Sequence, residues 1–586
     1  MKFHLYPALL LLAALTLNLT ACGDDDPTEP VTPTPDTPTP VTPTPTEPTP
    51  TTTACQGWPA DYGGVMLQAF WWNSYSESRW TTLTAQADEL AQYFQLIWVP
   101  NSGKTSSYYH NASSQTMGYD PCFWLDHTSC WGTEAELRQM IQTFRQKGTG
   151  VIEDVVINHK NGLTSWVDFP NETKGSYTIS WDNQNYSAIC STDECNQNGY
   201  KTTGARDTGD NFEGYRDLDH SNEAVQQNVN TYLSFLLNDL GYAGFRYDMV
   251  KGYAARYTGL YNATAQPQYS VGECWDASKS VVTTWLNGTK QDGQIQSAAF
   301  DFPLKYRINT AIGGGLFGQM ATASALATDR DYQRYAVTFV DNHDTYRDDN
   351  RLKRNVCAAN AYILCMPGTP CLFLKHWQTN RGTLKRLIAL RRAAGISNQS
   401  RIVTSQATDK GYLLCVEGAK GQLRLLIGEA DTPGSEWTLA VKGKNFAVWA
   451  GSGIDLTALS TITDSDAEPE DDAPVTVPAF CTVSEGEVCA FFEAPTDWTA
   501  TIMCWAWTDS GSNFTGGTWP GANCNMIGQA DNGRSVWKWS YTGTLTTLPE
   551  KIIFSNGGQP QTEDLPFTNG GYYTTDGLQA TVATTP

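Results

Sequence analysis

Residues 151–159 read VIEDVVINH, a short apolar run that ends in Asn158 and His159. A run of this length, closed by polar residues, is typical of a strand buried in a parallel sheet. Seven similar runs occur at 65–70, 95–99, 244–248, 269–273, 298–302, 336–340 and 371–374. Stretches with apolar residues three and four apart, which predict helices, lie between them, for example at 134–147 and 224–240. Eight strand–helix units predict an α/β fold, a TIM (β/α)8 barrel.

The other segments of the 586-residue chain are arranged around this barrel, which we expect to span 55–395. The segment 160–216 is too long for a simple connection and predicts a small protruding loop subdomain. Short alternating runs at 396–463 predict a small antiparallel β domain. An acidic linker at 464–480 then leads to 481–586, an aromatic-rich stretch that reads as a C-terminal β-sandwich.

The N-terminal residues predict targeting. Residues 1–21 contain an apolar stretch that is too short to span a bilayer, and Cys22 follows directly. We therefore expect a lipoprotein signal peptide and a lipid anchor on Cys22, with a plain secretory signal cut nearby as the alternative. The Thr/Pro-rich segment 22–54 predicts a stiff tether of roughly 90 Å. The acidic run after Cys22 resembles the export signal of Bacteroidetes lipoproteins, which implies a surface-exposed outer-membrane location.

The charge balance excludes one class of partner. Asp and Glu number 61 against 39 Lys and Arg, a net charge of −22, so no broad basic surface is available for nucleic acid or anionic lipid. Membrane contact is expected through the N-terminal lipid only, and a monomer is expected because no oligomer signal is visible. Two pairs of neighbouring cysteines are candidate disulfides, Cys122 with Cys130 and Cys190 with Cys195.

Three acidic side chains follow strands of the predicted barrel. Asp248, Glu273 and Asp344 come at or just after the runs 244–248, 269–273 and 336–340. Taken singly, an Asp at a strand end can simply cap the following helix. Because the carboxyl ends of barrel strands surround one pocket, the three together predict a hydrolase-like site.

Four segments in chain order, DVVINH, GFRYDMVKG, VGECWD and FVDNHD, resemble the conserved regions of the alpha-amylase family, glycoside hydrolase family 13. Further similarity lies at MGYDP (117–121) and DLDH (217–220). The resemblance covers roughly residues 60–460 and is strongest to plant-type alpha-amylases, which share Lys251-Gly252. It implies retaining endo-hydrolysis of alpha-1,4-glucosidic bonds in starch.

The resemblance also implies a role for each residue of the site. Asp248 corresponds to the nucleophile, Glu273 to the general acid and base, and Asp344 to the third acid. Retaining cleavage needs one ionised and one protonated carboxyl group about 5–5.5 Å apart. Arg246 lies two residues before Asp248, on the same strand face, and is placed to keep it ionised. The residues expected to bind substrate are Tyr119, His159, Arg246, Lys251 and His343.

Calcium is the cofactor that the resemblance implies, since this ion prefers hard oxygen ligands. The expected metal ligands, which would clamp the long loop to the barrel, are Asn158, Asp207, Asp217 and the carbonyl of Gly252. A solvated acidic loop without metal is the alternative.

Residues 481–586 resemble starch-binding modules of carbohydrate-binding module family 26, through WAWTDSG, TWPG and KIIFSNGGQPQTEDLP. The resemblance implies that Trp505, Trp507 and Trp519 stack on an alpha-glucan, with Gln561 as a hydrogen-bonding partner. The alternative is a stabilising β-sandwich with its tryptophans in the core.

The expected partner is therefore starch or another alpha-glucan. An exo-acting maltogenic or transglycosylating enzyme is an alternative on the same fold, because loop shape sets the product pattern. A non-catalytic surface glucan-binding protein is an alternative of another class, which the intact acids disfavour.

Overall fold

A computed structural model describes residues 57–105, 116–347, 350–429, 433–466 and 477–585, apart from 497, 509, 531–532, 544–546, 563, 576 and 583. Cys22 and the expected signal peptide and tether lie outside the described residues. Within the described ranges, no helix combines the length and the apolar character needed to cross a bilayer.

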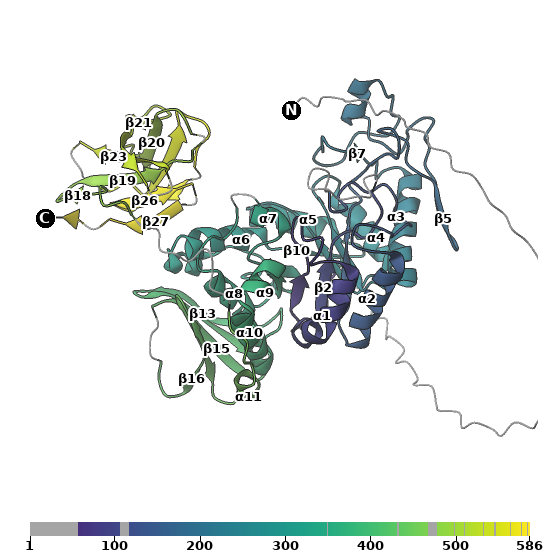
Figure 1. The fold of residues 1–586 in the computed structure, drawn as a ribbon, viewed down its shortest axis with the longest axis horizontal. Helices are drawn as coiled ribbons and strands as arrows, with labels where there is room; N and C mark the ends of the chain where they lie inside the picture. Colours follow the sequence, from purple (N-terminus) through teal and green to yellow (C-terminus); the bar gives the residue numbers. More distant parts are fainter. Residues whose placement is uncertain are drawn as a thin grey trace, which may run out of the picture. The chain divides into compact units, whose positions relative to one another are not determined.

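Eight parallel strands form a closed barrel, which confirms the predicted TIM fold (Figure 1). In chain order they are β1 (Met66–Gln68), β2 (Leu96–Val99), β3 (Gly150–Val155), β8 (Gly244–Tyr247), β9 (Tyr269–Gly272), β10 (Ala298–Phe300), β11 (Ala336–Phe339) and β12 (Thr369–Phe373). The closure pairs β1 with both β2 and β12. The register places Asp154 of β3 beside Arg246 of β8, which brings both to one end of the barrel.

Helices lie between the barrel strands, and the one predicted over 134–147 is confirmed as α2, which ends one residue earlier. The main ones are α1 (Trp80–Tyr93), α2 (Glu134–Gln146), α3 (Glu223–Phe235), α4 (Ala255–Ala265), α5 (Lys279–Gly288), α6 (Phe302–Ile308), α8 (Val356–Cys365) and α10 (Arg381–Ala394), with the short α7 (His343–Arg347) and α9 (Leu374–Thr379). A capping box between Thr133 and Glu136 starts α2. The predicted helix over 224–240 is not uniform, because α3 ends at Phe235 and a π-helical turn continues to Leu240.

The long third loop is closed at its base. Strand β4 (His159–Lys160) pairs antiparallel with β7 (Arg216–Asp217), and β5 (Glu172–Lys174) pairs with β6 (Tyr177–Ile179) between them. The buried Lys160 ammonium lies 4.9 Å from the ring centroid of Trp124 and 5.6 Å from that of Trp181. The long loop therefore packs through Lys160 against its own Trp181 and against Trp124 of the segment before α2, while its two ends meet beside β3.

The expected disulfides are not formed. Cys122, Cys130, Cys190 and Cys195 are all free thiols in the structure. Cys195 interacts with Asp193 and Arg216, whereas Cys190 lies near Asp207 and Asp219. The short spacing along the chain does not by itself join the two thiols: Cys195 lies within the 3-10 turn Glu194–Asn198, and Cys190 lies before this turn.

Two β units follow the barrel. The first is one antiparallel sheet in the order β13 (Arg401–Thr408), β14 (Gly411–Gly418), β15 (Gly421–Gly428), β17 (Phe446–Gly451), β16 (Trp437–Gly443). The second is a sandwich of two sheets. The five-stranded sheet has the order β22 (Asn525–Gln529), β23 (Ser535–Tyr541), β19 (Val488–Glu493), β26 (Gly571–Thr574), β27 (Gly577–Thr581). The four-stranded sheet has the order β21 (Ala522–Asn523), β20 (Ile502–Trp507), β24 (Lys551–Asn556), β25 (Leu565–Pro566). Phe492, Trp539 and Phe554 are part of the buried core of this sandwich.

Candidate active site

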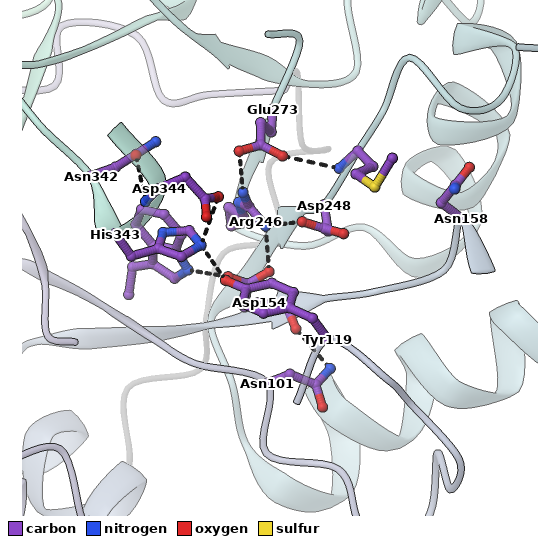
Figure 2. Close-up of polar contacts among 12 residues, drawn as sticks. Asn101, Tyr119, Asp154, Asn158, Arg246, Asp248, Glu273, Asn342, His343 and Asp344 are labelled. Atoms are coloured by element: carbon purple, nitrogen blue, oxygen red, sulfur yellow. Dashed lines mark hydrogen bonds and ion pairs between the residues drawn. The ribbon is translucent and has the colours of Figure 1, made fainter. Parts of the chain in front are cut away.

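The three acids of the sequence prediction line one cavity at the carboxyl ends of the strands. Asp248 follows β8, Glu273 follows β9, and Asp344 lies on α7 after β11. All three line a cavity of about 490 Å³. Each comes directly after a strand or in the first turn that follows it, so the barrel itself positions the three carboxyl groups (Figure 2).

A buried arginine holds two of these acids. Nη1 of Arg246 lies 2.7 Å from Asp248 Oδ1, and Nη2 lies 2.6 Å from Glu273 Oε1. The same Nη1 is also 2.7 Å from Oδ1 of Asp154 on the neighbouring strand (Figure 2). Arg246 is fully buried, and three surrounding carboxyl groups compensate for the loss of hydration of its charge.

Glu273 is placed in surroundings that suit an acid. Burial, together with the negative charges of Asp248 and Asp344, raises its pKa to about 8 in spite of Arg246. The amide N–H of Met249 donates to Oε2 at 3.2 Å, which fixes the carboxyl group. At neutral pH the group is therefore mostly protonated and able to give up a proton.

Asp344 is held in the opposite protonation state. The indole N–H of Trp72 donates to its Oδ1 at 2.8 Å, and Nε2 of His343 lies 3.1 Å from its Oδ2. Burial alone would raise the pKa of Asp344, but His343, the Trp72 hydrogen bond and Arg246 together lower it. Two carboxyl groups of one cavity are thus driven apart in pKa, as acid–base chemistry requires.

The residues predicted to bind substrate gather around the acids. Tyr119 stacks on His343 with 5.4 Å between ring centroids and donates to Asp154 Oδ2 at 2.8 Å. His159 lies against the ring of Phe212 at 4.5 Å, and its Nε2 is 2.9 Å from the Tyr119 carbonyl oxygen. Lys251 lines the cavity with its ammonium 3.2 Å from Asp276. His343 is fully enclosed and reaches the cavity through Asp344 and Tyr119.

Other residues of the site were not identified from the sequence. Those that line the cavity include Trp72, Phe212, Tyr215, Trp275 and Arg347, and Asp154 lies beneath it. Asp154 carried a usable signal, because a charged residue inside an apolar strand needs a buried partner. Among the aromatic residues, Trp275 lies in the quoted segment VGECWD, two residues after Glu273, whereas Phe212 and Tyr215 lie on a connection whose course the sequence does not reveal.

The four predicted metal ligands meet where the long loop joins the barrel. The side-chain amide of Asn158 is 3.4 Å from Asp217 Oδ1, and a Cβ on Gly252 would lie 2.0 Å from Asn158 Oδ1. Oxygen atoms Asn158 Oδ1 and Asp207 Oδ2 are buried, with no hydrogen-bond partner among the described residues. Burial and the charges of Asp207 and Asp193 raise the pKa of Asp217 to about 8.

These features fit a hard cation. The donor set consists of oxygen atoms only, which is the kind of set that calcium prefers. It contains the unpartnered buried oxygens of Asn158 and Asp207, the Asp217 carboxyl group with its raised pKa, and the backbone of Gly252, which comes close to Asn158. The set contains only two carboxylates, and among the described residues no group of three or more His, Cys, Asp and Glu side chains is arranged to hold a metal ion.

The aromatic residues of the C-terminal sandwich divide into two groups. Along β20, buried residues alternate with Trp505 and Trp507, which are partly exposed. Trp519 is 41% exposed, and its ring centroid lies 5.9 Å from that of Trp505. These three tryptophans lie outside the buried core, so they form an open aromatic surface. Gln561 is also exposed and accepts a hydrogen bond from Gln559 at 2.7 Å.

Comparison with known proteins agrees with this geometry. Residues 105–376 match the family model "Alpha amylase, catalytic domain", and residues 490–567 match "Starch-binding module 26". Among solved structures, a cyclomaltodextrin glucanotransferase with a three-domain ABC distribution superposes with a TM-score of 0.50 and 15% identity, over 66% of this chain and 99% of that one. That likeness bears on the fold alone.

Sequence relatives include plant and bacterial proteins. Probable alpha-amylase 2 of Arabidopsis thaliana is 30% identical over 408 residues, which is 66% of this chain and 93% of the relative. Glucan 1,4-alpha-maltotetraohydrolase of Stutzerimonas stutzeri is 28% identical over 398 residues, 62% of this chain and 68% of the relative. The chain belongs to the alpha-amylase family.

Proposed function

We propose that this protein is an alpha-amylase that hydrolyses internal alpha-1,4-glucosidic bonds of starch with retention of configuration. The observation that carries the proposal is the pair Asp248 and Glu273 on a single guanidinium, one carboxyl group beside each terminal nitrogen. Arg246 thereby holds the two acids close together, as a double displacement needs, whereas inverting enzymes hold their acids far enough apart to admit a water.

The residues divide the reaction between them. Glu273, protonated at neutral pH, gives its proton to the leaving glycosidic oxygen while Asp248 attacks the anomeric carbon. Deprotonated Glu273 then accepts a proton from a water molecule while the oxygen of that water attacks the anomeric carbon. The bond from this carbon to Asp248 breaks, which releases the sugar and restores the Asp248 carboxylate. Asp344 stays ionised through Trp72 and His343 and accepts hydrogen bonds from sugar hydroxyl groups.

The C-terminal module supports this reaction by binding. The partly exposed Trp505 and Trp507 and the exposed Trp519 offer ring faces for glucose units, and Gln561 offers an exposed amide. Binding through the module raises the local concentration of starch at the barrel without changing its chemistry.

Calcium is proposed as the structural ion of the enzyme. Asn158 Oδ1, Asp207, Asp217 and the Gly252 carbonyl would hold it, and the unpartnered buried oxygens at Asn158 and Asp207 support the assignment. When bound, the ion supplies positive charge that compensates the clustered carboxylates and ties the long loop to β3.

The cellular location is proposed from the sequence. The apolar stretch before Cys22 and the acidic residues after it support an outer-membrane lipoprotein with a Thr/Pro-rich tether. A monomer attached through its lipid would act on starch outside the cell.

The reaction is tested with soluble starch in calcium buffer, comparing iodine colour with reducing ends. An endo-acting enzyme removes the colour while few reducing ends have formed. Asp248→Asn and Glu273→Gln proteins, which keep the size of each side chain, are the matched controls and should release no sugar.

The other outcomes have defined meanings. Reducing ends that appear while iodine colour persists would indicate exo-action. No release by the unaltered protein, with starch binding intact, would replace the proposal with a glucan-binding protein.

A further inference from the structure

His343 is enclosed by aromatic rings and makes its polar contacts through its two ring nitrogens. Phe70 lies 5.0 Å away, Trp98 5.7 Å and Trp72 6.0 Å, measured between ring centroids, in addition to the stacked Tyr119. Burial lowers the pKa of His343 to about 4. The ring is therefore neutral at neutral pH, and its function depends on which nitrogen carries the single proton.

A glutamine on the first barrel strand contacts one of these nitrogens. Nε2 of Gln68 lies 2.9 Å from Nδ1 of His343, and the two residues are 275 positions apart in the chain. Gln68 is fully buried, and its Oε1 has no hydrogen-bond partner within the described ranges. Either the amide nitrogen or the amide oxygen of Gln68 could face Nδ1. The orientation of the amide and the tautomer of the histidine must therefore be decided together.

The contacts on the other nitrogen decide between the options. His343 Nε2 lies 2.6 Å from the Tyr119 hydroxyl oxygen and 3.1 Å from Asp344 Oδ2. The Tyr119 hydroxyl has one proton and is also 2.8 Å from Asp154 Oδ2. If that proton goes to Asp154, which also receives Arg246, then both neighbours of Nε2 are acceptors and Nε2 must be the protonated nitrogen.

We propose that Gln68 is a positioning residue that holds His343 in the Nε2–H tautomer by donating its amide N–H to Nδ1. Each close contact in the chain Gln68, His343, Tyr119, Asp154 then has one donor and one acceptor. The Nε2–H is directed to the side of the ring where Asp344 and Tyr119 line the cavity, so that His343 presents a donor there. The opposite tautomer would present a lone pair to the Asp344 carboxylate, which is repulsive.

The expected effect of Gln68 on the rate rests on the proposed function. The tautomer of His343 does not, because it can be measured without substrate. The full chain is labelled with ¹⁵N-histidine, and the His343 resonances are assigned by their loss in His343→Asn. We expect a protonated Nε2 and an unprotonated Nδ1. A protonated Nδ1 in the unaltered protein would overturn the assignment, whether or not the chain degrades starch.

Two variants at residue 68 give opposite perturbations. In Gln68→Glu the ionised carboxylate can only accept a hydrogen bond, so we expect Nδ1 of His343 to carry the proton and kcat/KM to fall about 100-fold. In Gln68→Met the size of the side chain is kept but the hydrogen-bond donor is lost, and we expect kcat/KM to fall about 10-fold. Gln296→Met is the matched control, because Gln296 is a buried glutamine whose amide N–H donates to the Gln294 carbonyl. It should keep the kinetics of the unaltered chain.

The melting temperature separates positioning from folding. We expect Gln68→Met and Gln296→Met to melt at similar temperatures, while only the former loses activity and the Nε2–H signature. Equal kinetics in both residue-68 variants and the unaltered protein, or an unchanged Nδ1 signal in Gln68→Glu, would refute the role of Gln68.

Discussion

Replacing Trp72 with phenylalanine tests how the third acid is held. The indole N–H donates to Asp344 Oδ1 at 2.8 Å, and the same ring carries the Arg347 guanidinium 4.5 Å from its centroid. Phenylalanine keeps an aromatic face for Arg347 but cannot donate. The change therefore removes one hydrogen bond to a charged group and leaves most of the packing in place.

The size of the effect follows from that bond. A hydrogen bond to a charged group contributes about 1.5–3 kcal/mol, and about 1.4 kcal/mol corresponds to tenfold, so kcat/KM should fall roughly 10- to 150-fold. Because the indole bond lowers the pKa of Asp344, its loss raises that pKa. Asp344 must be ionised to accept hydrogen bonds, so the acid limb of the pH–rate profile should move to higher pH.

The assay is kcat and KM on soluble starch from about pH 4 to 9, with Trp71→Phe as the matched control. Trp71 is the adjacent residue, and its indole donates to Glu77 at 3.3 Å, away from the three acids. Trp71→Phe should therefore leave the profile unchanged. Equal losses in the two variants, or an acid limb that does not move in Trp72→Phe, would show that the indole bond does not control Asp344.

Three further results are expected. The kcat/KM of the unaltered protein should fall above about pH 8, because the pKa of Glu273 is raised to about 8 and only its protonated form can act as the acid. Activity that stays level to pH 10 would contradict this. Calcium at 100 times its Kd should add about 2.7 kcal/mol to the free energy of unfolding, seen as a higher melting temperature that a chelator reverses and that Asp207→Asn lacks. Retention on insoluble starch should weaken about tenfold or more, with turnover of short soluble glucans unchanged, when alanine replaces all of Trp505, Trp507 and Trp519; unchanged retention would assign binding to another surface.

Much of the fold could be predicted because its signals are local. Each barrel strand is a short apolar run, and the polar residue that ends it stays next to it in the structure, as Asp248 does after β8 and Glu273 after β9. The pairing of Arg246 with Asp248 follows from strand alternation alone, since residues two apart point the same way. The exposed tryptophans of β20 follow from the same period.

Two predictions failed because local spacing did not determine the structure. Cys190 and Cys195 are close in the sequence and suggested a disulfide that is not formed: Cys195 lies within a 3-10 turn and Cys190 before it. The helix predicted over 224–240 changes to a π-helical turn after Phe235, a change that hydrophobic spacing does not encode.

The amino-acid sequence by itself determined the barrel, its three acids and the module that follows, because periodicity and strand ends are properties of adjacent residues. Only the tertiary structure decided that Trp72 and Gln68, from the first strand and its loop, meet Asp344 and His343 more than 270 positions later. Closure of the barrel pairs β1 with β12 and so places β1 two strands from β11, which leads into α7 with His343 and Asp344. No local pattern can specify a hydrogen bond between segments that approach each other only when the barrel closes.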